Sequence, residues 1–190
     1  MKKIMSLILS LIVLVSVTSC GQLDSQKAHD IAVPLIEASQ KLDAVLYGTG
    51  LPVSEEKNGK YTKVDSAEYT CLDDIKAQMN KIYTPELCEI IRNSALKGST
   101  SEHGTTYARY IDIDGALYSY DEAKVYVPHA RRYDLDSIKA TNMTDRRIIF
   151  KVDTYEADEN GNYSDVPENI ELKLIYDDAY ECWLLDTPTY

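Results

Sequence analysis

The sequence predicts an α+β protein in which N-terminal helices pack on a curved antiparallel sheet. Apolar residues recur at helical spacing in three segments between residues 28 and 95, whereas after residue 107 they mostly alternate as in strands. Asp114-Gly115 and Asn160-Gly161 have the composition of hairpin tips. Because the helices come first and a run of hairpin-connected strands follows, the pattern is typical of the α+β class.

The first predicted helix carries one apolar face, formed by Ala28, Ile31, Ala32, Leu35, Leu42 and Val45. Pro34 is compatible with a helix only near its start, so Asp30 is the predicted cap of the regular part. The stretch "YGTGLP", residues 47–52, ends the helix. The following "EEKNGKY" predicts a surface turn that leads into a short strand at residues 61–64.

Two short helices are predicted next. Thr70, with Asp73 three residues later, indicates a capping arrangement, and the first of these helices has an apolar stripe of Leu72, Ile75, Met79 and Ile82. Thr84 is the predicted cap of the second helix, with Pro85 at its first position, where the missing N–H costs nothing. Its predicted buried face is Leu87, Cys88, Ile91 and Ala95. Core packing explains both stripes.

A polar segment of small residues, "KGSTSEHG", separates the helices from the strands and predicts an exposed loop at residues 97–104. Alternating patterns then predict strands at residues 107–113, 116–120, 124–127, 137–141, 147–156, 170–176 and 181–185. The stretches "NMTD" and "DDAY" predict two further turns between them.

The N-terminus has the features of an export signal. Lys2 and Lys3 precede an apolar run at residues 4–17, which is too short to span a bilayer core of about 30 Å. The following "VTSCG" resembles a bacterial lipobox, in which the cysteine is lipidated and becomes the mature N-terminus. The resemblance implies a lipoprotein signal peptide at residues 1–19, a lipid on Cys20, a spacer at residues 20–27 and a single domain at residues 28–190. It also implies anchorage of the chain on the extracytoplasmic face of the cell membrane.

The composition limits the classes of partner. The formal net charge is −11, and loss of Lys2 and Lys3 with a cleaved signal would make it −13. Such a chain does not suit nucleic acid or an anionic membrane surface, and it suits either solubility on a tether or a basic partner. Three cysteines would remain besides the lipidated one: Cys71, Cys88 and Cys182. Because the number is odd, they form no disulfide framework, and Cys88 and Cys182 are interpreted as small core residues.

No motif for catalysis or metal binding emerges, so we expect neither an enzyme nor a cofactor. The three histidines, His29, His103 and His129, have no metal-ligand spacing to cysteine or carboxylate. "DIDG" and "DENGNYSD" lack the ligand order of a calcium loop and are interpreted as turns. Fifteen tyrosines, against one Phe and one Trp, suit strands with one solvated face, or a binding platform. The Arg131-Arg132 and Arg146-Arg147 pairs are interpreted as ion-paired surface residues.

Three segments carry a family resemblance: "YTKVDSAEYTCLDDIKAQMNKIYTPELCEII", "IELKLIYDDAYECWLLDTPTY", and "AVLYGTG" after the first helix. Together they resemble the IseA-type inhibitors of cell-wall DL-endopeptidases. The resemblance implies a non-enzymatic cell-surface protein that blocks NlpC/P60-type peptidoglycan hydrolases with an exposed loop near a cleft between two lobes. By position, that loop corresponds to Lys97, Gly98, Ser99, Thr100, Ser101, Glu102, His103 and Gly104. The lipid anchor and the three mature cysteines depart from the family pattern.

A second hypothesis stays open, because the C-terminal segment also resembles the NTF2-like and cystatin-like α+β domains of Gram-positive lipoproteins. That resemblance implies a curved sheet and helices around an apolar pocket lined by tyrosines, which would bind a small ligand or a wall fragment. An NTF2-like enzyme is disfavoured, because no Asp–His or paired-carboxylate pattern can be located in the sequence.

Overall fold

The computed structural model describes residues 23–101, 104–122, 131–158 and 161–189. Its helices are α1 (Ser25–Leu46), α2 (Leu72–Ile82) and α3 (Pro85–Ala95). Its strands are β1 (Val53–Asn58), β2 (Tyr61–Val64), β3 (Ser99–Ser101), β4 (Gly104–Thr106), β5 (Tyr110–Ile113), β6 (Ala116–Tyr120), β7 (Arg131–Met143), β8 (Arg147–Glu156), β9 (Glu168–Asp177) and β10 (Cys182–Leu185). The predicted α+β class, with the N-terminal helix packed on antiparallel strands, is confirmed.

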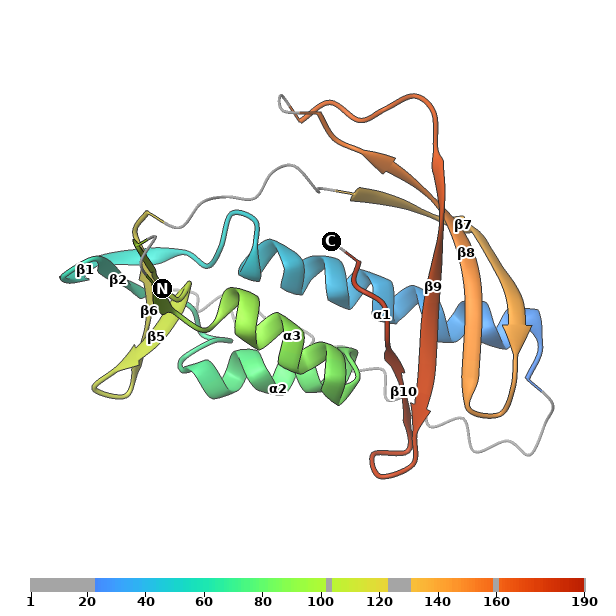
Figure 1. Ribbon diagram of the computed structural model, residues 1–190, viewed down its shortest axis with the longest axis horizontal. Helices are drawn as coiled ribbons and strands as arrows, with labels where there is room; N and C mark the ends of the chain where they lie inside the picture. The colour runs from blue at the N-terminus through green and yellow to red at the C-terminus, as the bar shows by residue number, and fades with distance from the viewer. Residues whose placement is uncertain (1–22, 102–103, 123–130, 159–160, 190) are drawn as a thin grey trace, which may run out of the picture.

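The strands are divided between two four-stranded sheets and one small hairpin. Sheet A has the order β1-β2-β6-β5, sheet B the order β10-β9-β8-β7, and β3 pairs only with β4. In Figure 1 the long helix α1 connects the two sheets, with its N-terminal half beside sheet B and its C-terminal end directed toward sheet A. Helices α2 and α3 lie alongside α1, between the two sheets.

Helix α1 begins earlier than predicted. Its N-cap is Asp24, whose side chain accepts a hydrogen bond from the Lys27 N–H at 2.8 Å, so the predicted cap at Asp30 is wrong and the helix includes the end of the predicted spacer. Pro34 lies inside the helix, on a solvent-exposed stripe with Asp30, Glu37 and Lys41. Water can therefore hydrogen-bond to the backbone carbonyl that the proline leaves without a partner.

Helices α2 and α3 begin within one residue of the predicted positions. The capping box is shifted by one residue, because Asp74, not Asp73, accepts hydrogen bonds from the N–H groups of Thr70 and Cys71. Thr84 is the N-cap residue of α3 and Pro85 its first residue, as predicted, but the Thr84 hydroxyl donates to Asp186 and makes no capping hydrogen bond. The predicted buried face of α3 is confirmed in full.

The core lies between the helices and the inner face of sheet B. Alternate residues of β8 and β9 point inward and are fully buried: Ile148, Phe150, Val152, Leu172 and Leu174. They pack with Ile36 of α1 and Met79 of α2 in one cluster. Burial of such side chains stabilises the fold by about 1.5–3 kcal/mol each, so this cluster holds helices and sheet together.

Most predicted strands are present, and the differences have local causes. Residues 116–120 and 147–156 form strands with the predicted bounds, whereas the strand predicted at 107–113 begins at Tyr110 and that at 137–141 extends over residues 131–143. The "EEKN" stretch, predicted as a turn, is part of β1, because Gly59 supplies the positive φ of 62° that lets it pair with β2. Asp114 and Gly115 both have positive φ, which confirms that tip.

Several predictions fall on residues that the structure does not describe. The signal peptide at 1–19, Cys20 and the strand at 124–127 lie outside the described ranges. Within the described part of the chain, no helix combines the length and apolar character needed to cross a membrane.

Candidate functional site

The predicted partner-binding loop folds as a hairpin at the end of α3. Ser99 pairs with Thr106, Thr100 with Thr105 and Ser101 with Gly104, so this segment is a two-stranded ladder and not an irregular loop. Glu102 and His103 lie outside the described residues. Lys97 and Gly98, which lead into the ladder, are exposed.

A close backbone approach fixes the base of this hairpin. A Cβ atom at Gly98 would lie 3.0 Å from the carbonyl oxygen of Thr106 and 3.1 Å from the backbone nitrogen of Ala108. Both atoms belong to the backbone and cannot rotate away, so a side chain at this position would push the two ends of the hairpin apart. Glycine is therefore the residue that lets the hairpin close here without displacing the backbone by a few tenths of an ångström.

Arg109 joins the hairpin to the ends of two helices. Its backbone N–H donates to the Ala95 carbonyl of α3 at 3.0 Å, and its Nη2 donates to the Gly48 carbonyl beyond α1 at 2.7 Å. The residue is 8% exposed and forms no ion pair within the described residues. A carbonyl just beyond a helix C-terminus carries partial negative charge, so the Gly48 carbonyl takes the place of a carboxylate beside this guanidinium.

The space around Arg109 is tight. A Cβ atom at Gly50 would lie 2.5 Å from Nη2, and Gly50 has a φ of 78°. The guanidinium Nε is buried without a hydrogen-bond partner, which adds a desolvation cost. Gly50 thus leaves room for the Arg109 side chain, and the Gly48 carbonyl binds it.

Three tyrosines bind the outgoing end of the hairpin to sheet A. Tyr107 stacks on Tyr120 with ring centroids 4.7 Å apart and an interplanar angle of 20°, and Tyr120 contacts Tyr61 at 5.5 Å. Lys60 Nζ lies 4.5 Å from the centre of the Tyr107 ring. Each aromatic pair contributes about 0.5–1.5 kcal/mol beyond area burial, so the hairpin is held firmly on the sheet.

Three buried tyrosines pack within the hydrophobic core. Tyr83 and Tyr110 are fully buried, and the Tyr110 hydroxyl donates to the Val45 carbonyl at 2.9 Å. The Tyr133 hydroxyl donates to the Thr189 carbonyl at 2.9 Å. These three rings fill the core of the protein, which gives the hypothesis of a tyrosine-lined cavity no support from them.

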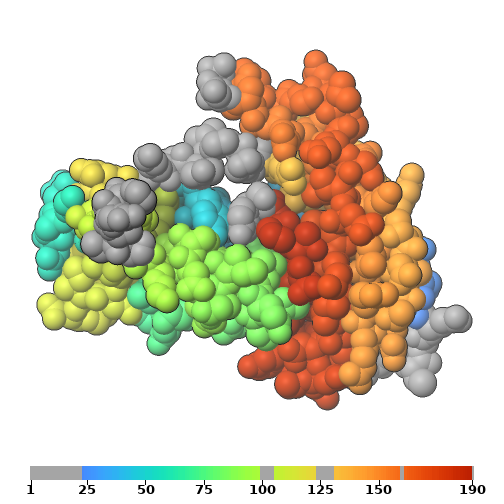
Figure 2. Space-filling model, in the orientation of Figure 1, coloured from blue at the N-terminus to red at the C-terminus, as the bar shows by residue number. Residues whose placement is uncertain are grey.

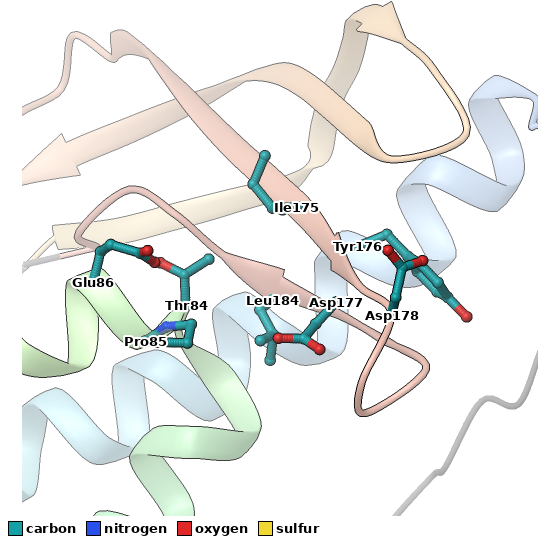
Figure 3. Close-up of a pocket in the computed structure, with 8 residues that line it drawn as sticks. All are labelled: Thr84, Pro85, Glu86, Ile175, Tyr176, Asp177, Asp178 and Leu184. Atoms are coloured by element: carbon teal, nitrogen blue, oxygen red, sulfur yellow. The ribbon is translucent and has the colours of Figure 1, made fainter.

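Figure 3 shows a shallow groove of about 290 Å³ between the start of α3 and the β9–β10 hairpin. Its two acidic residues on the β9–β10 turn have partners within the protein. Asp178 is paired with Arg146, and Asp177 accepts hydrogen bonds from the backbone N–H groups of Ala179 and Tyr180. These contacts build the turn beside the groove, so its acidic residues are explained by the fold.

A buried polar cluster attaches the C-terminal residues to α1. Thr189 Oγ1 lies 2.8 Å from Ser39 Oγ and 2.8 Å from Asp43 Oδ2, and the Ser39 hydroxyl donates to the Ile36 carbonyl at 2.7 Å. The Tyr83 hydroxyl donates to Asp43 Oδ1 at 3.1 Å. Burial raises the pKa of Asp43 to about 6.

Counting hydrogens shows which form of Asp43 fits this cluster. Three oxygen–oxygen contacts run in a line from Asp43 through Thr189 and Ser39 to the Ile36 carbonyl, but the two hydroxyls supply only two hydrogens. A proton on Asp43 supplies the third, because the acid then donates to Thr189 and Thr189 donates to Ser39. The ionised form leaves two oxygens facing each other without a hydrogen.

The thiols do not form a reactive site. Cys71, Cys88 and Cys182 are free, and burial raises the pKa of Cys88 to about 11. Burial also raises the pKa of Cys182, which is only partly buried, so the core interpretation holds for Cys88 alone. No group of three or more His, Cys, Asp or Glu side chains in the described ranges could hold a metal ion.

Sequence reasoning missed Arg109, the tyrosine stack and the polar cluster around Asp43. Arg109 gave one signal, a cation inside the predicted strand 107–113, but nothing in the sequence shows that α1 and α3 end beside it. No family model matches the chain, and no curated protein matches it. The likeness to IseA-type inhibitors and the lipobox therefore remain predictions.

Proposed function

We propose that the chain is a lipid-anchored cell-surface protein that binds and inhibits a cell-wall DL-endopeptidase of the NlpC/P60 type. The observation that carries the proposal is the β3–β4 hairpin, which lies outside both sheets on a fixed base. An inhibitor needs an exposed element with little freedom to lose on binding, because ordering a flexible loop lowers affinity. Gly98, Arg109 and Tyr107 provide such a base.

The charge of the chain supports a basic partner. A hydrolase that binds anionic wall polymers carries positive charge, and an acidic inhibitor would be steered toward it over several ångströms of solution. A lipid on Cys20 would hold the domain at the membrane, where wall hydrolases pass. Two acyl chains would make that attachment stable, whereas one chain alone would be reversible.

The test measures peptidoglycan cleavage by a purified NlpC/P60 endopeptidase in the presence of the full-length lipidated protein in detergent micelles. We expect cleavage to slow as the protein is added, and the effect to weaken with rising salt. If a micromolar excess of the protein leaves the cleavage rate unchanged, the proposal is wrong.

A shortened hairpin tests the site itself. Replacement of residues 101–104 by Asn-Gly would keep the Thr100–Thr105 pair and close it with a two-residue turn. We expect this variant to fold with unchanged stability and to lose inhibition. Lys41→Glu, on the exposed stripe of α1, is the control for a surface change elsewhere and should inhibit normally.

The anchor is tested separately by growth of the source cells with labelled palmitate. The wild-type protein should incorporate the label and remain with membranes, whereas Cys20→Ser should incorporate none. Labelling of both proteins, or of neither, would contradict the lipobox assignment.

A further inference from the structure

The last described residues of the chain lie against the second half of α1. In Figure 1 the chain leaves β10 and ends in front of α1, and in Figure 2 the dark-red C-terminal part of the chain reaches the surface beside α3. Pro188 is exposed, whereas Thr189 is only 2% exposed. The chain therefore ends in a short surface segment whose last described side chain is buried.

This segment is fixed to β9 as far as Thr187. The Asp186 N–H donates to the Lys173 carbonyl at 2.8 Å, and the Asp186 side chain pairs with Lys173 and accepts a hydrogen bond from the Thr84 hydroxyl. The Lys173 N–H donates to Thr187 Oγ1 at 3.1 Å. The residues beyond Thr187, residues 188 and 189, are called the C-terminal latch below, and they can move without disturbing β10.

The latch is attached through the polar groups of Thr189. The Thr189 hydroxyl lies 2.8 Å from Ser39 Oγ and 2.8 Å from Asp43 Oδ2, both on α1, and the Thr189 carbonyl accepts from the Tyr133 hydroxyl of β7 at 2.9 Å. Chain ends held by few contacts open locally at a small cost in free energy. The state of these three contacts therefore decides whether the latch is attached.

A proton on Asp43 completes the contacts of the latch. When the acid is protonated, Asp43 donates to Thr189, Thr189 donates to Ser39, and Ser39 donates to the Ile36 carbonyl, so each contact holds one hydrogen. When the acid is ionised, one contact holds none. The carboxylate is then also buried with no ion pair among the described residues, which is costly. Detachment of Thr189 lets water reach the carboxylate, so ionisation favours the detached latch.

The other titratable groups that face Asp43 keep their protons near neutral pH. These groups are Tyr83, between α2 and α3, and Tyr133 on β7, and burial raises the pKa of both hydroxyls above its usual range. On α1 itself, Glu37 and Lys41 belong to the solvent-exposed stripe of the helix. The charge of the cluster therefore changes through Asp43.

The charged groups next to the cluster are ion-paired. Arg131, which lies near Tyr133, pairs with two glutamates of sheet B. Asp186, which follows β10, pairs with Lys173. No charge among the described residues is therefore left beside Asp43 to take the place of the missing proton.

We propose that the C-terminal latch is a proton-controlled switch: Thr189 stays attached to α1 while the Asp43 acid is protonated, and it detaches more often once that acid is ionised. Detachment opens the junction of α1 and β7, where Ser39 and the Tyr133 hydroxyl become accessible to water and the surface gains a negative charge. The inference does not depend on the proposed inhibition, because no contact with an endopeptidase enters it.

The test measures the detached population in the full-length lipidated protein, in detergent micelles, with ¹³C-labelled threonine methyl groups. Chemical-exchange saturation transfer on the Thr189 methyl signal detects a minor state whose shift approaches that of an unstructured threonine. Thr189→Ser keeps the hydroxyl and removes the methyl group, so it assigns the signal. The methyl group of Thr154, which is fully buried in β8, is the internal control and should show no such state.

We expect the ratio of detached to attached latch to rise by about tenfold from pH 5 to pH 8, given a pKa of about 6 for the attached Asp43 and 3.8 for a solvated carboxyl. Asp43→Asn should show one ratio at both pH values. Tyr133→Phe removes a hydrogen bond that does not titrate, so it should raise the ratio by roughly fivefold at both pH values. Asp30→Asn, an exposed change on the same helix, should behave as the wild type does.

Three results would overturn the proposal. The first is the absence of a detached population in the wild type at pH 8. The second is a ratio that changes by less than about twofold between pH 5 and pH 8. The third is a pH-dependent rise that persists in Asp43→Asn, because another group would then control the latch. Each result leaves the proposed inhibition untouched, since the cleavage of peptidoglycan is a separate measurement.

Discussion

Replacement of Asp43 by asparagine should stabilise the protein at neutral and alkaline pH. The side chain contacts Tyr83 and Thr189, and the hydrogen count of the cluster favours a neutral group at this position. Asparagine is neutral at every pH. Its amide nitrogen can donate to Thr189 Oγ1, and its carbonyl oxygen can accept from the Tyr83 hydroxyl, so it reproduces the protonated acid.

The magnitude follows from the two pKa values of Asp43. The pKa is about 6 in the folded protein and 3.8 in an exposed chain, so the folded state holds the proton more tightly. The contribution of Asp43 to stability is therefore highest below about pH 4, falls as the pH rises from about 4 to 6, and changes little above that range. The full difference is about 3 kcal/mol at pH 8 and roughly half of that at pH 5.

Urea unfolding of the wild type and of Asp43→Asn at pH 5 and pH 8 measures this difference. The advantage of the variant should grow close to tenfold in the unfolding equilibrium constant between the two pH values. Asp30→Asn, an exposed carboxyl on the same helix, is the matched control and should show no such growth. A stability difference that is equal at both pH values, or an Asp43 carboxyl resonance that titrates below pH 4, would refute the reasoning.

Three further predictions concern the helix ends and the thiols. Asp74→Ala should lower the midpoint of thermal unfolding more than Asp73→Ala, because Asp74 accepts hydrogen bonds from Thr70 and Cys71 whereas Asp73 pairs with Lys76. Hydrogen bonding to Thr70 lowers the pKa of Asp74. The difference between the two midpoints should therefore disappear as the pH falls below the usual carboxyl range and Asp74 is protonated. Arg109→Met should destabilise the fold by about 1–3 kcal/mol through loss of the bond to Gly48, and it should speed hydrogen exchange in residues 99–106; Arg92→Met, an exposed change on α3, should do neither. Cys88 should react with a thiol reagent at neutral pH only after denaturation, while Cys182 reacts in the folded protein; reaction of all thiols at one rate would contradict the burial of Cys88.

Local rules in the sequence predicted the elements whose partners are close in the chain. The buried face of α3 and the β8 strand followed from periodicity, and Asp114-Gly115 followed from turn chemistry. The cap of α1 was misplaced because Pro34 was expected to lie near the helix start. Tertiary packing against sheet B places the helix cap six residues earlier than predicted, at Asp24 in place of Asp30, and leaves the proline on the exposed side of the helix.

The division of the strands into two sheets could not be predicted, because it depends on contacts between residues far apart in the sequence. β6 pairs with β2 across more than fifty residues, and β7 begins a separate sheet after the gap in the described chain. The polar segment at residues 97–104 was expected to be irregular, since Ser, Thr and Gly lack the apolar alternation of a strand. It forms a ladder because its ends are held together by Gly98 and Arg109.

Several basic side chains of this acidic protein bind other groups of the same fold. The Arg109 side chain binds the Gly48 carbonyl beyond α1, and the Arg131 side chain pairs with Glu156 of β8 and Glu168 of β9. Arg109 is buried and Arg131 is ion-paired. In the chain as a whole, Asp and Glu residues outnumber Lys and Arg residues by 31 to 20. The charge that remains unpaired at the surface is therefore mostly negative, as at Asp165. Long-range attraction depends on the net charge, which internal pairing leaves unchanged at −11, so we expect a basic partner to be attracted over distance whichever surface it contacts.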